Sequence, residues 1–177
     1  MRRIYFVGTS GSGKSTLAKY LAAKLGLKHI ELDAIQWLPD WQKRSPEEFM
    51  KLLDKELSQA THGFVMDGNF TQAEVIIQAN SDLIFLDYPR ITVFGRILKR
   101  SIKRVATREE LWAGNREELK FLLSLNPDLN PVLWSWKSHH KRVESYNSLI
   151  NTLLPEVRVH RVKSKSELKR LKALFTN

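Results

Sequence analysis

Residues 8–15 read Gly8-Thr9-Ser10-Gly11-Ser12-Gly13-Lys14-Ser15, which matches the phosphate-binding pattern G-x-x-x-x-G-K-[ST] at every fixed position. The apolar run Ile4-Tyr5-Phe6-Val7 precedes it and predicts a buried strand, while apolar residues at helical spacing predict a helix over 15–25. Glycines let the backbone wrap closely around a phosphate, and a helix that begins at the loop turns its positive dipole end toward the anion. We therefore predict a phosphate-binding loop (the P-loop, residues 8–15) that binds ATP or GTP with magnesium.

The P-loop pattern also assigns roles to its polar residues. The Lys14 ammonium is expected to reach the β- and γ-phosphates, and the Ser15 hydroxyl is expected to ligate Mg²⁺. The predicted nucleotide contacts in this stretch are Gly8, Ser10, Gly11, Ser12, Gly13, Lys14, Ser15 and Thr16. A Gly/Ser-rich loop without function is the alternative, but the strand before it and the helix after it are the context that a phosphate site requires.

The rest of the chain alternates short apolar runs with amphipathic stretches. Strands are predicted at 4–7, 29–32, 64–66, 83–86 and 157–162, and helices at 46–60, 72–78, 91–107, 109–125, 132–153 and 166–175. This alternation is typical of parallel βαβ units, so it predicts a doubly wound α/β sheet. Ligands of such sheets bind beyond the carboxyl ends of the strands.

Aspartates follow three of the predicted strands. Asp67 resembles a Walker-B-type carboxylate that holds Mg²⁺, although Asp-Gly is also a common turn. Asp33 is predicted to accept a proton from an attacking hydroxyl or to bind substrate hydroxyls, with helix capping or a turn as the alternative. Asp87 comes just before a Pro-containing turn, where a structural role is favoured.

Basic residues are concentrated in one predicted helix. Lys and Arg number 29 against 19 Asp and Glu, and the net charge of +10 favours anionic partners. Residues 89–108 contain no acid, and arginines spaced by four form a stripe there: Arg96, Arg100, Arg104 and Arg108. Like charges at this spacing repel each other, so an anion should offset the cost. We predict that at least two of the four clamp a triphosphate, with a solvated face or a nucleic-acid contact as the alternative.

Composition bounds the class of protein. The 177 residues are 42% hydrophobic and 27% charged, which predicts one soluble globular domain spanning 1–177. Cysteine is absent, which excludes disulfides and thiolate metal sites, and no apolar run approaches the roughly 20 residues of a membrane helix. No secretory signal is visible, so we expect a cytoplasmic protein without a membrane segment. It is expected to be a monomer or a homodimer.

Several further motifs, together with the P-loop, carry a resemblance to known kinases. They are Leu32-Asp33-Ala34 followed by Trp37 and Trp41, Asp67-Gly68-Asn69-Phe70, Leu86-Asp87-Tyr88-Pro89-Arg90, and the run from Glu110 to Glu117. As an ordered set they resemble the small nucleoside and nucleotide kinases, which include adenylate and shikimate kinases. The likeness is closer to the bacterial P-loop proteins known as adenylate-kinase-like or DNA topology modulation proteins, and it covers most of the chain.

The resemblance implies a three-layer α/β/α P-loop NTPase fold with a five-stranded parallel sheet and a short helical lid over about 96–130. It also implies ATP with Mg²⁺, an Asp33 that faces the acceptor, and catalytic lid arginines at Arg96, Arg100 and Arg104. The segment Lys163-Ser164-Lys165 would lie against adenine, which makes Lys165 a nucleotide-binding candidate.

The predicted acceptor side departs from adenylate kinases. Their Asp-Gly-Phe-Pro-Arg is Asp67-Gly68-Asn69-Phe70-Thr71 here, so the arginine that holds the AMP phosphate is absent, and Arg90 is the candidate to compensate. Trp37, Trp41 and Asn69 follow the second and third strands, where an acceptor would bind, with core packing as the alternative for the tryptophans. Since no Asn-Lys-x-Asp guanine signature appears, ATP is favoured over GTP.

These observations predict an ATP-dependent phosphotransferase that moves the γ-phosphate to a small hydroxyl- or phosphate-bearing acceptor, such as a nucleoside or nucleotide. The predicted acceptor-binding residues are Asp33, Trp37, Asp67, Asn69 and Arg90, and the predicted metal ligands are Ser15 and Asp67. The alternative is an ATP-binding regulatory or nucleic-acid-associated P-loop protein with little kinase activity.

Overall fold

The computed structural model describes residues 1–68, 77 and 81–176 of the chain. The helix predicted at 72–78 lies almost entirely outside this part, and so does the predicted acceptor residue Asn69.

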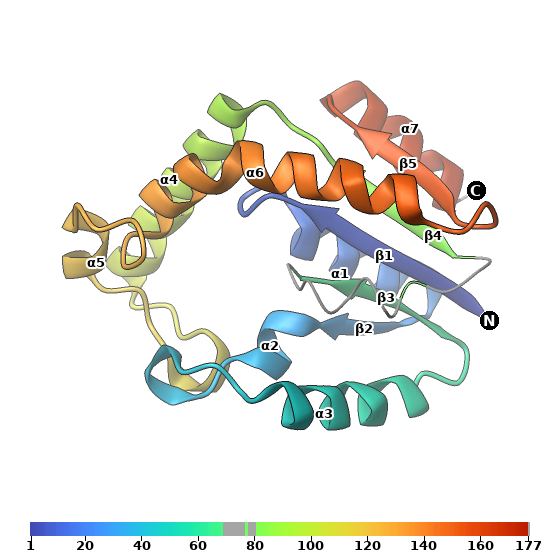
Figure 1. Ribbon diagram of the computed structural model, residues 1–177, viewed down its shortest axis with the longest axis horizontal. Helices are drawn as coiled ribbons and strands as arrows, with labels where there is room; N and C mark the ends of the chain where they lie inside the picture. Colours follow the sequence, from blue (N-terminus) through green and yellow to red (C-terminus); the bar gives the residue numbers. More distant parts are fainter. Residues whose placement is uncertain (69–76, 78–80, 177) are drawn as a thin grey trace.

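A five-stranded, all-parallel sheet forms the centre of the molecule, with the strand order β2-β3-β1-β4-β5 (Figure 1). The strands are β1 (Arg2–Gly8), β2 (Lys28–Glu31), β3 (Gly63–Asp67), β4 (Asp82–Leu86) and β5 (Arg158–Val162). Because later strands are added on both sides of β1, the order reverses there, and the P-loop follows this strand at the usual ligand edge of a doubly wound sheet. The predicted parallel five-stranded sheet is confirmed.

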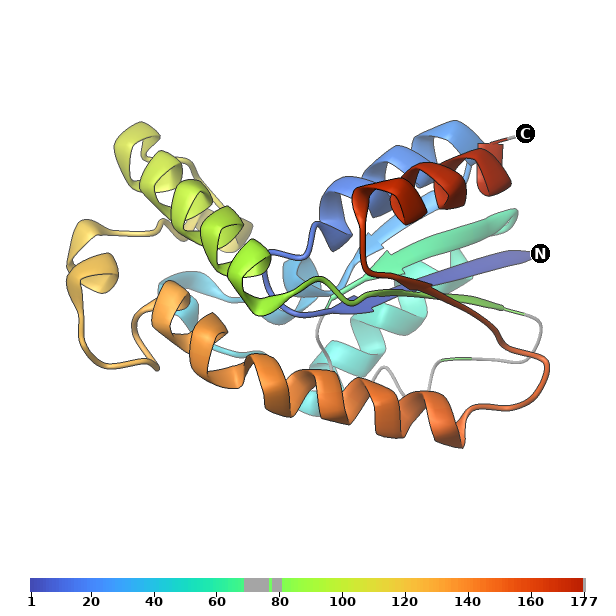
Figure 2. The same ribbon diagram turned by 90° about the horizontal axis from the view of Figure 1, so that it is seen from above.

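Helices cover both faces of the sheet. They are α1 (Lys14–Leu25), α2 (Leu32–Gln36), α3 (Pro46–Ser58), α4 (Arg90–Thr107), α5 (Leu119–Leu123), α6 (Pro131–Thr152) and α7 (Lys165–Thr176), with short 3₁₀ turns η1 (Pro39–Trp41) and η3 (Trp112–Gly114). Seen from above, α1 and α7 lie on one side of the strands and α3 and α6 on the other (Figure 2). Beyond the sheet, α4, α5 and the first turns of α6 lie together on one side of the molecule (Figure 1).

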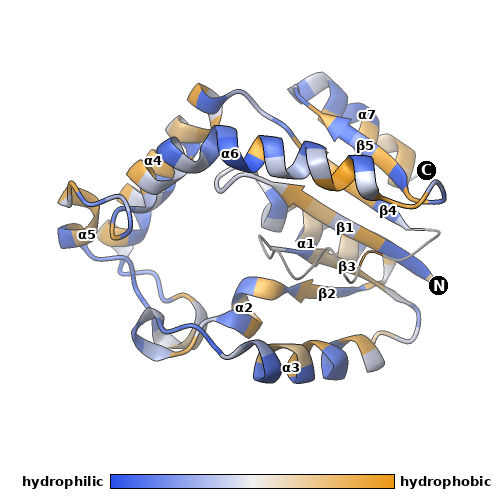
Figure 3. Ribbon diagram, viewed as in Figure 1, coloured by the Kyte–Doolittle hydropathy of each residue, from blue (hydrophilic) through white to orange (hydrophobic). Residues whose placement is uncertain are grey.

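The hydrophobic core has two halves because successive residues of β1 point to opposite faces. One buried cluster includes Ile4, Phe6, Leu17, Leu21, Leu171 and Phe175, and the other includes Tyr5, Val7, Phe49, Leu53, Met66 and Phe85. Every residue of β3 and β4 is buried, as expected for central strands covered on both faces. Figure 3 shows β1 changing from hydrophilic at its N-terminal end to hydrophobic toward the P-loop. No helix in the described part of the chain has the length and apolar character needed to cross a bilayer.

Local sequence signals explain where several helices begin. Ser45 caps α3 by accepting a hydrogen bond from the Glu48 amide at 3.2 Å, and Pro46 occupies the first helical position, as predicted. Asn130 caps α6 in the same way, with its side chain accepting from two backbone amides, and Pro131 follows it. These caps satisfy amides that the first turn of a helix otherwise leaves unpaired.

The structure corrects two predicted elements. The helix predicted over 109–125 is wrong, because Ala113 and Gly114 adopt left-handed backbone angles, with φ of 54° and 79°, and only η3 and α5 form there. The strand predicted at 29–32 ends one residue earlier, at Glu31, and Asp33 lies in the first turn of α2 instead of at a strand end.

We predict that Gly63→Ala destabilises the fold. Gly63 has a φ of 125°, and a Cβ atom there would lie 2.2 Å from the backbone oxygen of Arg2 on the paired strand β1. Because backbone cannot move aside as a flexible side chain can, urea unfolding should show a loss of at least about 2 kcal/mol in the free energy of unfolding.

The matched control for this substitution is Gly95→Ala. Gly95 lies inside α4, and a Cβ atom there would meet nothing within 4 Å, so the helix should be unchanged or stabilised by up to about 1 kcal/mol. Equal losses of stability in the two variants would contradict the steric argument.

Candidate active site

The P-loop wraps tightly between β1 and α1, and the packing around it leaves no room for a side chain at Gly8 or Gly11. Gly11 has a φ of 80°, and a Cβ atom there would lie 2.5 Å from Cγ1 of Ile97 on α4. Within the loop, the Ser12 amide donates to the Thr9 oxygen at 3.2 Å. The loop is therefore pressed directly against the arginine-bearing helix.

Lys14 is buried, and its ammonium lies within the P-loop. Its Nζ donates to the backbone oxygens of Gly8 at 2.8 Å and Thr9 at 3.1 Å. Burial lowers the pKa of Lys14 to about 8, and the charges of Asp33 and Asp67 partly oppose this shift. A phosphate group that approached the ammonium would supply the negative charge that the buried lysine lacks.

Ser15 and Asp67, the two predicted metal ligands, are hydrogen-bonded to each other. Ser15 Oγ donates to Asp67 Oδ2 at 2.5 Å, and the Asp67 side chain is almost fully buried at the end of β3. His29 Nε2 lies 2.6 Å from Asp67 Oδ1 and fixes the orientation of the carboxylate from β2. A hydroxyl and a carboxylate oxygen are the hard donors that suit Mg²⁺, so this pair fits the predicted ion. The sequence did not point to His29, because nothing in a short strand shows which residue will face a carboxylate.

Asp33 comes to the P-loop from the start of α2. Burial raises the pKa of the Asp33 carboxyl, the Lys14 charge opposes this, and the charges of Asp67 and Glu31 raise it further. Asp33 and Asp67 are thus near enough to Lys14, and to each other, for their charges to interact. The structure brings these predicted site residues together.

The three predicted lid arginines of α4 have different partners. Arg96 Nη1 donates to the Ser12 oxygen of the P-loop at 3.0 Å, and its guanidinium lies 4.3 Å above the centre of the Tyr88 ring. Arg104 forms an ion pair with Glu117 at 2.7 Å and a longer one with Glu109 at 3.6 Å. Arg96 is therefore held by the loop, and Arg104 by acidic residues from beyond its own helix.

Arg100 lies between these two arginines along α4 and is held less firmly. Its Nε is buried without a hydrogen-bond partner. Burial lowers the pKa of Arg100, the Arg104 charge lowers it further, and the charges of Glu117 and Asp33 oppose this. Arg100 is therefore the arginine whose guanidinium is available to a ligand beside Asp33 and Lys14.

Three residues of α6 that sequence reasoning missed lie at or near the P-loop. The Ser135 hydroxyl donates to the Ser10 oxygen at 3.4 Å. Tyr146 Oη donates to the Gly8 oxygen at 3.3 Å. The Arg142 guanidinium lies 4.5 Å above the centre of the Trp134 ring, and its charge lowers the pKa of Lys14. No motif marks these positions, because they belong to a long helix whose sequence predicts only its length.

Other predicted residues have partners of their own. Arg90 Nε donates to the backbone oxygen of Trp136 at 2.9 Å, and the Arg90 guanidinium stacks 3.7 Å from the centre of the Trp136 ring. Trp37 and Trp41 pack edge to face, with ring centres 5.5 Å apart. Lys165 is the exposed first residue of α7.

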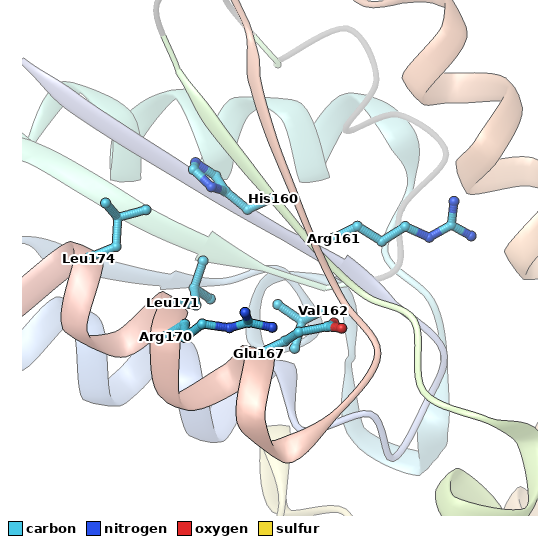
Figure 4. Close-up of a pocket in the computed structure, with 7 residues that line it drawn as sticks. All are labelled: His160, Arg161, Val162, Glu167, Arg170, Leu171 and Leu174. Carbon is cyan, nitrogen blue, oxygen red and sulfur yellow. The ribbon is translucent and has the colours of Figure 1, made fainter.

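Asp87 forms an ion pair with Arg161 at 2.7 Å, which agrees with the structural role favoured from the sequence. A separate cavity of about 390 Å³ lies between β5 and α7 (Figure 4). It is lined by His160, Arg161, Val162, Glu167, Arg170, Leu171 and Leu174. No P-loop residue lines it, so the chemistry described above lies elsewhere.

Known proteins are similar to this chain in sequence and in fold. The family described as "ATPase family associated with various cellular activities (AAA)" matches residues 4–87. A shikimate kinase from Persephonella marina is 32% identical over 140 residues, which cover 69% of this chain and 79% of the relative.

Two solved structures align over nearly the whole chain. The shikimate kinase from Bacteroides thetaiotaomicron has a TM-score of 0.55 at 18% identity, covering 99% of both chains. The deoxyadenosine kinase from M. mycoides with bound dATP has a TM-score of 0.56 at 14% identity, covering 99% of this chain and 100% of the other. At these identities the two likenesses establish the shared fold.

We predict that ATP binding is accompanied by proton uptake at Lys14. With a pKa of about 8 the free lysine is partly neutral near pH 8, whereas bound phosphates favour its charged form. Affinity should therefore fall as the pH rises above about 8, where protonation of Lys14 must accompany binding. Calorimetry at about pH 8.5, in buffers of different ionisation enthalpy, measures this uptake directly.

Lys14→Met should abolish the proton uptake, while Lys24→Met, on the exposed side of the same helix, should leave it unchanged. The same binding enthalpy in every buffer for the wild-type protein would show that Lys14 is already charged when free.

Proposed function

The chain belongs to the family of small P-loop kinases that includes its shikimate kinase relative, and from that premise we propose that it transfers the γ-phosphate of ATP to a hydroxyl group of a small acceptor. It is an ATP-dependent small-molecule kinase. The choice of a hydroxyl acceptor rests on the carboxylate of Asp33, which lies near Lys14 and Arg100. A base next to the phosphate site can take the proton of an incoming hydroxyl.

The P-loop residues hold the triphosphate in this proposal. Backbone amides of the loop and the N-terminal end of α1 face the phosphates, and Lys14 exchanges the Gly8 and Thr9 oxygens for phosphate oxygens. Ser15 and Asp67 would hold Mg²⁺, which neutralises phosphate charge when it is bound with the nucleotide. His29 keeps the Asp67 carboxylate in the orientation that this requires.

Asp33 and Arg100 act on the transfer itself. The acceptor hydroxyl gives its proton to Asp33 as its oxygen bonds to the γ-phosphorus, and the bond to the β–γ bridging oxygen breaks with its electron pair leaving on ADP. The Arg100 guanidinium stabilises the charge on the transferred group, since in the described part of the chain it is held by no ion pair, whereas Arg96 is bound to the P-loop and Arg104 to Glu117. Residues of about 96–130 would form the lid of one kinase domain spanning 1–177.

The acceptor is a small hydroxylated molecule of the size of shikimate or a nucleoside, the compounds named by the relatives. Arg142 adds a second positive charge near Lys14, which favours an acceptor or nucleotide carrying negative charge. Trp37 and Trp41 lie in the segment that follows α2, the helix that carries Asp33, and there they shape the acceptor side. In this proposal, Lys165 and the exposed segment before α7 contact the adenine end of ATP.

A phosphate-transfer screen tests the proposal. MgATP is offered with shikimate, deoxyadenosine, other nucleosides and nucleotides, and phosphorylated products are detected by mass together with ADP release. We expect one acceptor to be phosphorylated, and Lys14→Ala to lower the rate by about a hundredfold or more because a principal phosphate contact is lost.

Asp33→Asn should lose transfer while it retains MgATP binding, and Asp54→Asn, exposed on α3, should behave as wild type. If no acceptor raises ADP production above the level of Lys14→Ala, the kinase proposal fails.

We further predict that Arg100→Ala slows phosphate transfer much more than it weakens ATP binding. The loss of a charge that acts mainly in the transition state should reduce kcat by about 10²–10³. The dissociation constant of MgATP should change by less than about threefold, because the P-loop contacts remain.

Lys99→Ala removes an exposed charge from the neighbouring position of α4 and is the matched control. Parallel losses of binding and turnover in Arg100→Ala would mean that the arginine only binds the nucleotide.

A further inference from the structure

Two loops that are far apart in sequence meet beside the proposed acceptor site. The acceptor-side loop, residues 37–43, follows the helix α2 that carries Asp33, and the lid loop, residues 110–116, follows α4. Each loop is closed by an antiparallel bridge between its first and last residues. Figure 1 shows both segments, around η1 and η3, on the lower left of the molecule.

The two loops have the same backbone conformation. In each, the amide of the second residue donates to the oxygen of the sixth, and the amide of the sixth donates to the oxygen of the third. These bonds join Leu38 with Gln42, Gln42 with Pro39, Leu111 with Asn115, and Asn115 with Trp112. The fourth and fifth residues of both loops have positive φ. The match means that the two loops have the same local fold.

The Asn115 side chain joins the lid loop to the acceptor-side loop. Its Oδ1 accepts from the Trp41 amide at 2.9 Å, and its Nδ2 donates to the oxygens of Leu38 at 2.8 Å and Trp112 at 2.9 Å. Asn115 is only 6% exposed, so water does not readily replace these bonds. We call this set of three hydrogen bonds the Asn115 clasp.

Backbone strain is concentrated at the clasp. In the part of the chain that the structure describes, four non-glycine residues have positive φ, and three of them, Asp40, Trp41 and Ala113, belong to these loops. Such angles are unfavourable for residues with a side chain and persist where surrounding contacts enforce them. Trp41 is both strained and bound to Asn115, so the clasp is one of the contacts that maintain its conformation.

The lid loop is also tied to the arginine helix. Glu117 follows Asn115 by two residues and pairs with Arg104 at 2.7 Å, where both side chains are largely buried. Arg104 lies one helical turn from Arg100, whose Nε has no partner. The lid loop is therefore bonded to the acceptor-side loop at Asn115 and, two residues later at Glu117, to the helix that carries Arg100.

We propose that Asn115 is a positioning residue that couples the acceptor-side loop to the lid, so that the segment after Asp33 and the arginine helix adopt their working positions together. This inference rests on the proposed function for its effect on transfer, but the coupling itself is a property of the folded chain. When an acceptor binds beside the acceptor-side loop, this coupling moves the arginine helix so that Arg100 reaches its working position. Phosphate transfer therefore depends on the presence of an acceptor.

Amide hydrogen exchange by mass spectrometry tests the coupling in the full chain with MgATP as the only ligand. In Asn115→Ala, exchange should accelerate about tenfold or more in peptides covering 110–116 and also in those covering 37–43, more than 70 residues away, while α1 and α3 stay unchanged. Asn126→Ala is the matched control, because Asn126 lies in the same lid segment, is exposed, and makes its side-chain bond only to Asp128.

Kinetics give the second readout, with MgATP and whichever of shikimate or deoxyadenosine the wild-type protein phosphorylates. Asn115→Ala should raise KM for that acceptor and lower kcat, each by about tenfold, with the dissociation constant of MgATP within about twofold of wild type. Glu117→Gln should lower kcat and leave exchange in 37–43 unchanged, because it breaks only the link to Arg104. Asn115→Ser replaces the alanine variant if that variant does not fold.

Exchange in 37–43 at the wild-type rate in Asn115→Ala would overturn the coupling. So would a fall in kcat that matches the loss of folded protein, with KM for the acceptor unchanged. If the wild-type protein phosphorylates neither compound, the exchange experiment still decides the clasp, and it is the proposed acceptor that has failed.

Discussion

A lysine ammonium buried inside the P-loop sets the conditions that the rest of the site has to meet. Removing a charge from water is costly unless nearby groups compensate it, and the Gly8 and Thr9 oxygens together with Asp33 and Asp67 do so only in part. The lowered pKa of Lys14 reflects the remaining cost. The sheet order supplies the compensating groups, because β3 and the segment after β2 end at the same edge as β1.

The arginine stripe illustrates how like charges can share one helix face. Arg96 is held by the Ser12 oxygen and the Tyr88 ring, and Arg104 by Glu117 and Glu109. An arginine whose charge is compensated by its own partners repels its neighbours less than an isolated charge would. The helix therefore tolerates arginines at a spacing of four residues. Within the described part of the chain, Arg100 lacks the ion pairs that hold Arg104 and the loop contact that holds Arg96, so an incoming anion would compensate its charge most.

The sequence alone was sufficient where local chemistry determines structure. The P-loop, the buried strands and the caps of α3 follow from motif, periodicity and capping residues, and the parallel sheet follows from their alternation. The backbone of the predicted lid segment was harder to predict, because Ala113 adopts a left-handed angle that its residue type does not favour. The partners of Asn115 and Arg104 depend on contacts made only after folding. Helical spacing places Arg104 in the arginine stripe, but it does not indicate that Glu117 forms an ion pair with it.

The perturbed groups of the site are shifted in complementary directions. Burial raises the pKa of Asp33 and lowers that of Lys14 and Arg100, so each charged form is disfavoured by the same exclusion of water. Lys14, Arg100 and Arg142 bring three positive charges to the neighbourhood of two carboxylates, Asp33 and Asp67. A triphosphate carries more negative charge than this excess requires, which leaves room for a divalent cation at Ser15 and Asp67. In the proposed complex, nucleotide and metal together would balance the charges of these side chains.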